Sequence, residues 1–455
     1  MSTIKLAASI IVTRYQGDAL EILLVRRAPE MRFFGGYWVF PGGNVGDEDR
    51  SGADAAEELI LRRCAVRELR EETGLHCDDL ISVCRITTPP FYPVRYKTQF
   101  FLTQNPPGAE PHLAGTELTE YGFFDPAEAV RLWERGAMDI APPVLFLLRE
   151  LARHGRTNFV AQAAATAATF DSVGVHPAYF SPGMFIAPLR TPTLPPATTT
   201  NTVIVGQQTL YVIDPATPEP DEQARLFYQM DKMQAEGARF ENILLTHHHV
   251  DHVGAVNAVS RRYQLPVRAH PLTYDRVPGD YLRGPPLNEG DRINLDTAPD
   301  GTQDWHLDVF HTPGHAVDHL CFIDNRYHAA VVGDMLSTVS TILIDPPEGH
   351  MRTYLDSLRR LLEVPIKTLV PAHGLPHQDG HGLIRQFLDH RRMREEQALA
   401  ALTAEPQSVE SLVPVIYTTT PPEVYPLAAR SLLAELIKLR EDGKCEEIAG
   451  SWRVT

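Results

Sequence analysis

Cysteine, long apolar runs and basic residues are all scarce in this chain of 455 residues. Its five cysteines are scattered and odd in number, and no two of them are spaced as CxxC. This pattern argues against a disulfide-stapled secreted domain and favours reduced thiols in a cytoplasmic protein. No apolar run reaches membrane-spanning length, and the first residues lack the apolar core of a signal peptide, so we expect no membrane partner.

Basic residues are outnumbered by acidic ones, 42 to 58, which gives a formal net charge of −16. So large an acidic excess argues against a general polyanion-binding surface, although a local basic site is compatible with it. The hydrophobic share of 43% and the charged share of 22% are ordinary for a soluble globular protein. A chain of this length predicts about two or three domains with well-formed cores.

Histidine is concentrated between residues 246 and 252, which read THHHVDH. The apolar run 243–245 precedes this segment and predicts a buried strand that ends in a loop. Alternation along an extended chain directs His247, His249 and Asp251 toward one side. Imidazole and carboxylate groups suit zinc and related metals. The competing interpretations are a solvated histidine-rich loop and a purification tag, but a tag would be terminal and would lack the aspartate and the preceding strand.

Three more candidate ligands lie downstream, namely His315, Asp334 and His373. Each follows an apolar run, so several strands are expected to deliver their ends to one rim of the fold. Within the cluster itself, His252 is placed to face a second ion beside the first. His248 is expected to point away from the metals, because its neighbours on both sides face them.

The order of these motifs, HxHxDH, then TPGH, a GD aspartate and a late histidine, resembles the metallo-β-lactamase superfamily over about residues 181–378. The resemblance implies an αβ/βα sandwich and a hydrolase in which two cations activate a shared water. It implies two Zn²⁺ ions, with Mn²⁺ or Fe²⁺ as alternatives. The implied ligands are His247, His249 and His315 for one ion, Asp251, His252 and His373 for the other, and Asp334 between them.

Three residues gain candidate roles from the same resemblance. Asp214 matches an early aspartate that supports the site in that family, and Asp251 counts among the catalytic as well as the metal-binding residues. His319 either lines the substrate side or supports a ligand from behind, and the supporting role is favoured.

The N-terminal region, residues 1–153, is expected to fold as strands followed by a helix. The expected strands cover residues 7–13, 20–25 and 37–40. A Pro-Gly-Gly turn follows, and a helical pattern then runs from about Ala55 to Glu72 and stops at Gly74, a natural C-cap.

Three carboxylates share one face at the end of this helix. Glu68, Glu71 and Glu72 have the spacing i, i+3 and i+4. A hard cation such as Mg²⁺ or Mn²⁺ would relieve their repulsion. The competing interpretation is an exposed acidic helix end in which Arg67 pairs with Glu71.

The full string REUxEExGU, where U is aliphatic, resembles the Nudix hydrolases and implies an α/β/α sandwich. The implied chemistry is attack of water on a diphosphate, in which Glu68, Glu71 and Glu72 bind metal and assist the attack. The box is longer than usual around residues 47–57, which leaves its upstream glutamate unassigned, with Glu48 as a candidate. A lengthened box is similar to the branch that contains peroxisomal coenzyme A diphosphatases.

Four charged residues outside the box are further candidates. Arg26 and Arg27 follow a strand, and they either meet substrate phosphates or lie at the sheet edge. Glu117 and Glu120 lie in GTELTEYGFFDPA, which looks like a later segment of the same branch. Either glutamate adds a metal contact or is a surface carboxylate.

Composition shifts after residue 153. The stretch 154–180 is rich in small residues and weakly patterned, so we expect a linker with at most a short helix. Residues 198–202 are then expected to form the first strand of the metal domain.

Residues 388–455 are expected to form three helices and a short β-wing. The expected helices cover 390–403, 408–417 and 427–441, with Ser408 as an N-cap. This order resembles the winged-helix tail of lactamase-like endoribonucleases. Acidic residues offset the basic ones around the third helix, so a packing or dimerising module is favoured over a nucleic-acid partner.

The whole sequence therefore predicts an α/β multidomain protein, and three functions stay open. A two-headed metal-dependent hydrolase would cleave a diphosphate of coenzyme A or a nucleotide conjugate in one head. Its other head would cleave a thioester or related ester. An RNA-processing enzyme would instead use the lactamase-like head as a nuclease and the Nudix head on 5′ ends. A non-catalytic sensor would be expected to lose a ligand, whereas both ligand sets are complete here.

Overall fold

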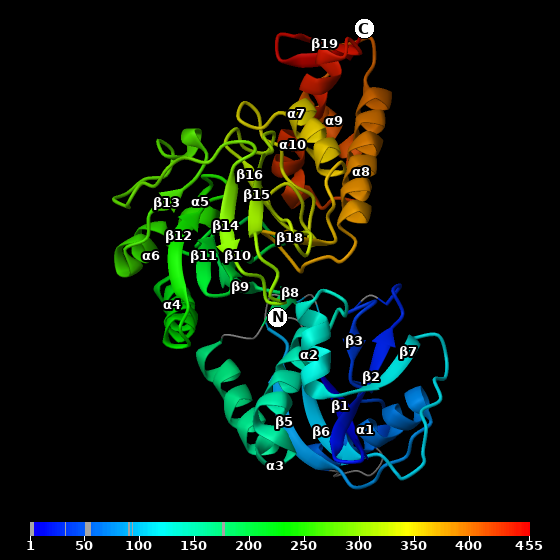
Figure 1. Cartoon of the computed structure of the whole chain (residues 1–455). Coiled ribbons are helices and arrows are strands. Elements are labelled where there is room, and N and C mark those ends of the chain that lie inside the picture. Colours follow the sequence, from blue (N-terminus) through cyan, green and yellow to red (C-terminus); the bar gives the residue numbers. More distant parts are fainter. Residues whose placement is uncertain (1–3, 32, 51–55, 90–91, 93, 175–177) are drawn as a thin grey trace. The chain divides into compact units, whose positions relative to one another are not determined.

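The first strands of the chain build a seven-stranded sheet, as the computed structural model in Figure 1 shows. The described residues are 4–455 without 32, 51–55, 90, 91, 93 and 175–177, and they divide into two compact units, 1–187 with 299–301 and the remainder. In the first unit the strand order is β3-β2-β1-β6-β5, while β4 pairs with β1 and β7 with β2. The bounds are β1 Ile4–Gln16, β2 Ala19–Arg27, β3 Trp38–Val39, β4 Gly42–Asn44, β5 Ile81–Thr87, β6 Arg95–Gln104 and β7 Leu118–Phe124.

Helix α1 (Glu57–Thr73) covers one face of this sheet. Its buried side chains share one hydrophobic cluster with the strands, including Leu61, Ala65, Leu69, Ile10 and Phe101. The helix ends where the sequence predicts, because Gly74 adopts the left-handed conformation, with φ 70°, that favours glycine. The helix start expected near residue 55 lies outside the described residues.

Helices α2 (Pro126–Glu134) and α3 (Pro142–Val173) lie on the other side of the sheet. Side chains alternate along β6, so Phe100 and Phe101 point to opposite faces. Phe101 belongs to the cluster under α1, whereas Phe100 lines a pocket together with Pro142 of α3. The predicted α/β/α sandwich is therefore confirmed.

Helix α3 contradicts the expected linker with at most a short helix over residues 154–180. The backbone breaks at Gly155, with φ 61° and ψ 167°, and the chain then continues as helix. Ala163 is fully buried, and Phe170 lies against Phe146 with ring centroids 5.0 Å apart. The two halves of α3 therefore pack against each other, and alanine suits this arrangement because it combines small size with the highest helix propensity.

Two sheets form the core of the second unit. Within this unit, the strand order of the first sheet is β13-β12-β11-β10, and that of the second sheet is β14-β15-β16-β17-β18. The bounds are β10 Thr199–Gly206, β11 Thr209–Ile213, β12 Arg239–Leu244, β13 Val267–Arg268, β14 Arg292–Asp296, β15 Trp305–His311, β16 Leu320–Asp324, β17 Ala329–Gly333 and β18 Thr368–Pro371. The strand expected at 198–202 is β10, but β8 (Tyr179–Ser181) and β9 (Met184–Arg190) precede it.

Helices lie on the outside of both sheets. Helices α4 (Pro220–Ala235) and α6 (Val256–Tyr263) contact β12, while α7 (Met351–Leu361) contributes to the cluster on the other sheet. The sheets contact each other through β10, β11 and β14, where the Tyr211 hydroxyl donates to the carbonyl of Asn294 at 3.0 Å. This layering is the expected αβ/βα sandwich.

Five strand ends bring the candidate ligands to one rim, as the sequence predicts. Strands β11 and β12 are parallel neighbours, and so are β17 and β18, so within each pair the ends lie on the same edge. The segments that follow these strands and β15 carry Asp214, residues 246–252, His315, Asp334 and His373.

The C-terminal elements match the expected helices and wing (Figure 1). They are α8 (Gly380–Ala401), α9 (Val409–Ile416), α10 (Tyr425–Glu441), β19 (Cys445–Ile448) and β20 (Ser451–Val454). Ser408 caps α9 by accepting from the Ser411 amide at 3.2 Å. Helix α8 begins earlier than the residue 390 we expected. None of the helices described is both long enough and apolar enough to span a lipid bilayer.

Candidate functional site

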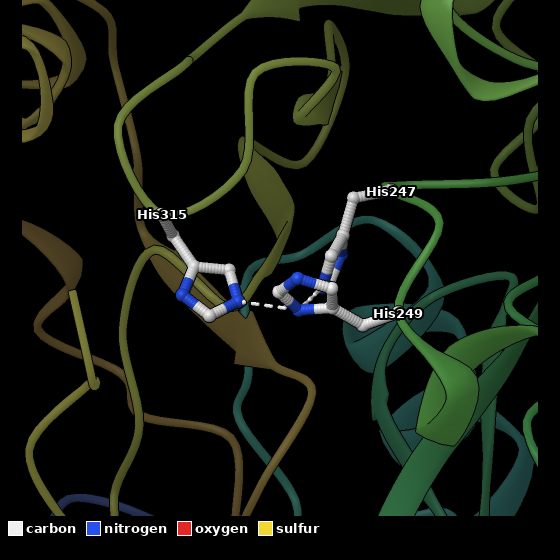
Figure 2. A group of neighbouring side chains, drawn as sticks. All are labelled: His247, His249 and His315. Carbon is white, nitrogen blue, oxygen red and sulfur yellow. Dashed lines mark hydrogen bonds between the residues drawn. The ribbon is translucent and has the colours of Figure 1, made fainter. Parts of the chain in front are cut away.

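Three histidines of the second unit converge on one point, as Figure 2 shows. His247 and His249 lie between β12 and the short helix α5 (Val250–Val253), and His315 lies after β15. His249 Nδ1 is 3.0 Å from His247 Nε2 and 3.0 Å from His315 Nε2. Ring nitrogens that approach so closely need a proton or a cation between them, because their lone pairs otherwise repel.

Asp334 lies between this group and a second one. Its Oδ2 atom is 3.4 Å from His315 Nε2, while Oδ1 is 3.5 Å from His252 Nε2 and 3.2 Å from His373 Nε2. Asp251 Oδ2 is 3.6 Å from the same nitrogen of His373. The structure thus brings together every residue expected to bind the two ions, with Asp334 in the middle.

Both groups fit divalent cations. Within the histidine triad, and within the set of Asp251, His252 and His373, the ligand atoms lie no more than 4.8 Å from one another. His252 Nε2 and Asp334 Oδ1 are buried without a hydrogen-bond partner among the described residues. An unpaired buried polar atom is unfavourable, so these atoms suit a bound cation. Imidazole and carboxylate donors match Zn²⁺, Mn²⁺ or Fe²⁺.

Asp214 holds the histidine loop from behind. Its carboxylate accepts from the Thr246 amide at 2.8 Å and from the Thr246 hydroxyl at 2.6 Å, and it lies 2.8 Å from His252 Nδ1. Asp214 has a positive φ of 47°, which aspartate tolerates better than most residues. The aspartate therefore fixes both the loop and the orientation of His252.

Two other imidazoles are fixed through backbone carbonyls. His315 Nδ1 lies 2.9 Å from the Leu343 carbonyl, and His373 Nδ1 lies 2.9 Å from the Thr199 carbonyl. A carbonyl can only accept, so each Nδ1 carries the proton. The Nε2 lone pair of both rings is therefore available to a metal.

His319 lies behind Asp334, in the interior of the second unit. It is fully buried, with Nδ1 2.9 Å from the Thr312 hydroxyl. Its Nε2 accepts from the backbone amide of Asp334 at 3.1 Å. Both nitrogens thus have partners within the protein, an arrangement that favours the supporting role over a substrate contact.

Burial keeps two of the histidines neutral. Burial, followed by the nearby His252, holds the pKa of His247 well below its usual value, and burial and His315 lower the pKa of His249 to about 3. A neutral imidazole is the form that binds metal. Burial lowers the pKa of His252 as well, but Asp334 and Asp214 outweigh burial and raise it well above the usual value.

In the first unit, Glu68 and Glu72 approach the glycines of β4, a strand that stands where the sequence predicts a turn. The Gly42 amide donates to Glu72 Oε2 at 2.9 Å. A Cβ on Gly43 would lie 2.4 Å from Glu68 Oε1, so the strand needs glycine where the carboxylate passes. Burial is the main reason that the pKa of Glu72 is raised to about 8, and repulsion from Glu68 adds to it.

Arg67 lies among the carboxylates of the Nudix-like helix. Its Nη1 is 2.9 Å from both Glu68 Oε1 and Glu71 Oε2, so the i, i+4 pair that we weighed as the competing interpretation is present. In the part of the chain that is described, the three glutamates do not meet as closely as the ligands of the second unit. Glu72 faces β4, while Glu71 extends toward solvent with half its side chain exposed.

Asp49 anchors Arg67, although no sequence motif predicted it. Asp49 is buried and accepts from Arg67 Nε at 3.0 Å, from Arg67 Nη2 at 2.8 Å and from the Gly46 amide at 2.8 Å. Burial raises the pKa of Asp49, but these hydrogen bonds outweigh burial and lower it. Glu48, our candidate, is more exposed, and it lies 3.3 Å from Arg67. No motif distinguished Asp49 from its acidic neighbours.

Arg27 and Glu117 both influence the pKa of Glu72. The positive charge of Arg27 lowers the pKa of Glu72 and the negative charge of Glu117 raises it, although both effects are smaller than that of burial. Arg26 instead pairs with Glu120 at 2.7 Å on the exposed edge of the sheet. The edge interpretation therefore describes Arg26, whereas Arg27 lies near the acidic helix end.

An aromatic pocket lies on the α3 side of the first sheet. Its lining is Phe33, Phe34, Ile86, Thr88, Pro89, Tyr92, Tyr96, Thr98, Phe100, Pro142, Pro143 and Ala178. Phe100 is in register with Ser9, and Ser9 is in register with Gly42, whose amide binds Glu72. Two strand spacings, about 10 Å, separate the backbones of Phe100 and Gly42. The pocket itself lies on the face of the sheet opposite α1, whose last turn carries Glu72.

Four basic residues of the C-terminal elements lie beside acidic ones. Lys438 lies beside Glu395, Arg430 beside Asp345, and Arg440 and Lys444 beside Glu447 and Glu395.

Family comparisons match three segments in the expected order. Residues 3–143 match the NUDIX domain, residues 195–373 the metallo-beta-lactamase superfamily, and residues 408–452 the beta-lactamase associated winged helix domain. The predicted identity and order of the three domains are confirmed.

Similar proteins support the lactamase-like part. A Beta-lactamase-like protein 2 homolog of Drosophila melanogaster is 27% identical, covering 54% of this chain and 83% of the relative. The lactamase-like protein nscB of Trichophyton verrucosum is 30% identical, covering 44% of this chain and 69% of the relative. A beta-lactamase domain protein from Burkholderia ambifaria shares the fold at a TM-score of 0.50 and 20% identity, covering 61% of this chain and 93% of its own.

Proposed function

We propose, from the premise that this chain belongs to the metallo-β-lactamase superfamily and also carries a Nudix domain and a winged helix, that it is a two-headed metal-dependent hydrolase. The observation that carries the proposal is the position of Asp334, which touches His315 on one side and His252 and His373 on the other. A binding protein without turnover has no need of a carboxylate shared between two ligand groups.

The second unit would hydrolyse a thioester or related ester. The histidine triad would hold one cation. Asp251, His252 and His373 would hold the other, and Asp334 would bind both. Bound cations would supply a hydroxide nucleophile at neutral pH and positive charge opposite the developing oxyanion. The chain itself contributes orientation, because Asp214 and two backbone carbonyls fix three of the imidazoles.

The first unit would cleave a diphosphate. Glu68, Glu71 and Glu72 would hold Mg²⁺ or Mn²⁺, which would neutralise the phosphate oxygens. Glu72 is mostly buried, and the Gly42 amide holds its carboxylate at 2.9 Å, where with a bound cation it would be ionised and could assist an attacking water. Arg27 is the nearby cation for a phosphate, and its Nε is buried without a hydrogen-bond partner among the described residues.

The aromatic pocket points to the chemical class of the diphosphate substrate. Phenylalanine, tyrosine and proline side chains dominate its wall, which favours a flat aromatic ring. Coenzyme A and nucleotide conjugates both join a purine or pyrimidine ring to a diphosphate. We therefore propose a substrate that joins an aromatic nucleobase to a diphosphate, with this pocket as the site of the base.

Assaying both heads in one protein tests the proposal. Metal-loaded protein is offered acyl-coenzyme A thioesters, free coenzyme A, nucleotide sugars and short RNA, alongside His249→Ala and Glu71→Ala. We expect His249→Ala to abolish thioester cleavage and to spare diphosphate cleavage, and Glu71→Ala to do the reverse. Neither assignment survives if both variants leave every activity unchanged.

Metal content gives a second readout that needs no substrate. Elemental analysis of the purified protein should find about two zinc-like ions per chain. They should be lost in His249→Ala and retained in Glu71→Ala.

An RNA-processing enzyme is the second candidate, and the winged-helix match favours it. Phosphate binding needs unpaired basic residues, and the C-terminal lysines and arginines named above are ion-paired. Cleavage of the short RNA, lost in His249→Ala, would favour this candidate over the thioesterase.

A further inference from the structure

The segment between β17 and α7 approaches the metal site with residues far from every motif. The Leu343 carbonyl lies 2.9 Å from His315 Nδ1. Five residues later, Glu348 Oε1 is 3.2 Å from His248 Nε2 and Oε2 is 3.7 Å from His249 Nε2. Residues 342–348, which we call the brace, therefore contact two of the three histidines in Figure 2.

His248 connects the brace to a second carboxylate. Its Nδ1 is 2.9 Å from Asp318 Oδ1, and Asp318 is fully buried and also accepts from the Thr273 hydroxyl at 2.7 Å. The ring of His248 is thus held between Asp318 and Glu348. Our expectation that His248 would avoid the histidine triad agrees with this geometry, although the ring is engaged and not free in solvent.

A third cation is the obvious alternative for Glu348. Ligand atoms of His248, His249 and Glu348 lie within 4.8 Å of one another. His249, however, already directs Nδ1 at His247 and His315. A neutral imidazole that offers Nδ1 to a cation keeps its proton on Nε2. The nitrogen that faces Glu348 then carries a proton, so this nitrogen is not free to share a metal with Glu348.

The C-terminal elements hold the brace from the opposite side. Arg391 of α8 donates to the Ile342 carbonyl, and Arg430 of α10 pairs with Asp345, with its Nε 2.7 Å from Oδ1. Glu441 of α10 lies 2.8 Å from His350 Nε2 at the start of α7. Elements of the winged-helix part thus touch the chain on both sides of Leu343 and Glu348.

We propose that Glu348 is a positioning residue that orients His249 for metal binding, and that Arg430 keeps the brace in the position this requires. A carboxylate behind an imidazole fixes the ring and makes it a stronger ligand. The inference rests on the proposed metal site and extends it, because it gives the winged-helix part a role at the lactamase-like head.

Metal affinity and the cobalt spectrum of the full-length protein test the role of Glu348. In Glu348→Ala, we expect zinc affinity, measured by competition with a chromogenic chelator, to fall roughly 10- to 100-fold. The visible absorption bands of the Co²⁺-substituted protein should shift, because the ligand field at His249 changes. Glu348→Gln keeps an acceptor oxygen and should recover part of the affinity. The melting temperature of the metal-free protein should not change, because Glu348 is partly exposed.

Two reference variants separate the possible failures. Asp356→Asn removes an exposed carboxylate of α7 that pairs only at the surface with Arg359, and should leave affinity and spectrum unchanged. If His249→Ala retains its zinc, the proposal of the metal site is wrong. If His249→Ala loses zinc while Glu348→Ala binds as the unchanged protein does, the metal site stands and the inference about Glu348 is overturned.

The role of Arg430 has its own test. Arg430→Ala should weaken zinc binding in the same direction, by about 2- to 5-fold. In the Glu348→Ala background it should add nothing further, because both substitutions act through one segment. An additive effect, or an Arg430→Ala protein with unchanged affinity, would overturn this half of the proposal.

Discussion

The carboxylate of Asp214 lies 2.8 Å from Nδ1 of His252, on the side of the ring opposite Asp334. Asp214 therefore determines which nitrogen of His252 faces the metal site. It does so from a left-handed backbone position that asparagine also adopts readily.

Asp214→Asn should therefore weaken metal binding without unfolding the loop. The amide preserves the size of the side chain and its backbone preference, but it removes the negative charge behind His252. We expect the affinity of the group that contains His252 to fall roughly 10- to 100-fold, measured by zinc titration. Asp214→Ala should also lower the melting temperature, because it removes both acceptors of Thr246. Equal zinc affinity in Asp214→Asn and the unchanged protein would contradict this role.

Gly43→Ala should impair the Nudix head alone. The added methyl would lie 2.4 Å from the Glu68 carboxylate, which can swing away because it ends a flexible side chain. We expect diphosphate cleavage to fall roughly 10-fold or more. Thioester cleavage in the same preparation is the internal control for folding and should not change.

Gly46→Ala is the matched control for that substitution. Its added methyl would displace the Glu48 carboxylate instead, at 2.5 Å. Asp49, and not Glu48, accepts the shorter bonds from Arg67. We therefore expect a loss of less than about 3-fold in kcat, since an exposed side chain can rearrange. A loss as large as that of Gly43→Ala would instead identify Glu48 as the upstream glutamate of the box.

The rim of the second unit was predictable because each ligand directly follows an apolar run. Buried strands and the polar residues at their ends are local features of sequence, and parallel pairing brings such ends together. The order of His247, His315, Asp334 and His373 along the chain therefore predicted their convergence. The helix end at Gly74 was predictable for the same local reason.

Contacts between segments that are distant in the sequence were not predictable, because no local sequence pattern indicates them. Glu348 is one of many glutamates in the sequence, and nothing near it indicates that the chain returns to His249. The weak pattern of the alanine-rich half of α3 predicts a linker, whereas this half is helical and packs on Phe146 of the first half. Helical stability there comes from the partner surface, which composition does not reveal.

Glu435 should make the C-terminal part less stable as pH rises. Burial raises its pKa to about 7, although Arg391, 3.9 Å away, acts in the opposite direction. In an unfolded chain a glutamate titrates near pH ~4.3. The folded chain thus holds the proton more tightly, so stability falls between about pH 4.3 and pH 7 and is constant above that range.

Glu435→Gln removes this dependence. At pH 5 the variant should match the unchanged protein to within about 1 kcal/mol, and at pH 8 it should be more stable by up to about 3 kcal/mol. Urea unfolding followed by circular dichroism at both pH values measures the difference. A variant that is less stable at pH 8 than at pH 5, relative to the unchanged protein, would show that the ion pair with Arg391 outweighs burial.

Gly314→Ala should weaken zinc binding by the histidine triad, because it displaces His315. Gly314 has a φ of 136°, and an added methyl would lie 2.3 Å from the backbone nitrogen of Tyr354 in α7. Tyr354 is fully buried and its hydroxyl donates to the Met335 carbonyl at 2.8 Å, so α7 is not free to retreat. The loop that carries His315 must move instead, and this ring is 3.0 Å from His249.

We therefore expect Gly314→Ala to lose at least about 10-fold in zinc affinity and about 1–3 kcal/mol in stability. Gly237→Ala is its control, because Gly237 also has a positive φ, 101°, but nothing lies within 4 Å of the added methyl. That variant should show the backbone strain alone, roughly 1–2 kcal/mol, with unchanged zinc affinity. If the two variants bind zinc equally well, then contact between Gly314 and α7 does not determine the position of His315.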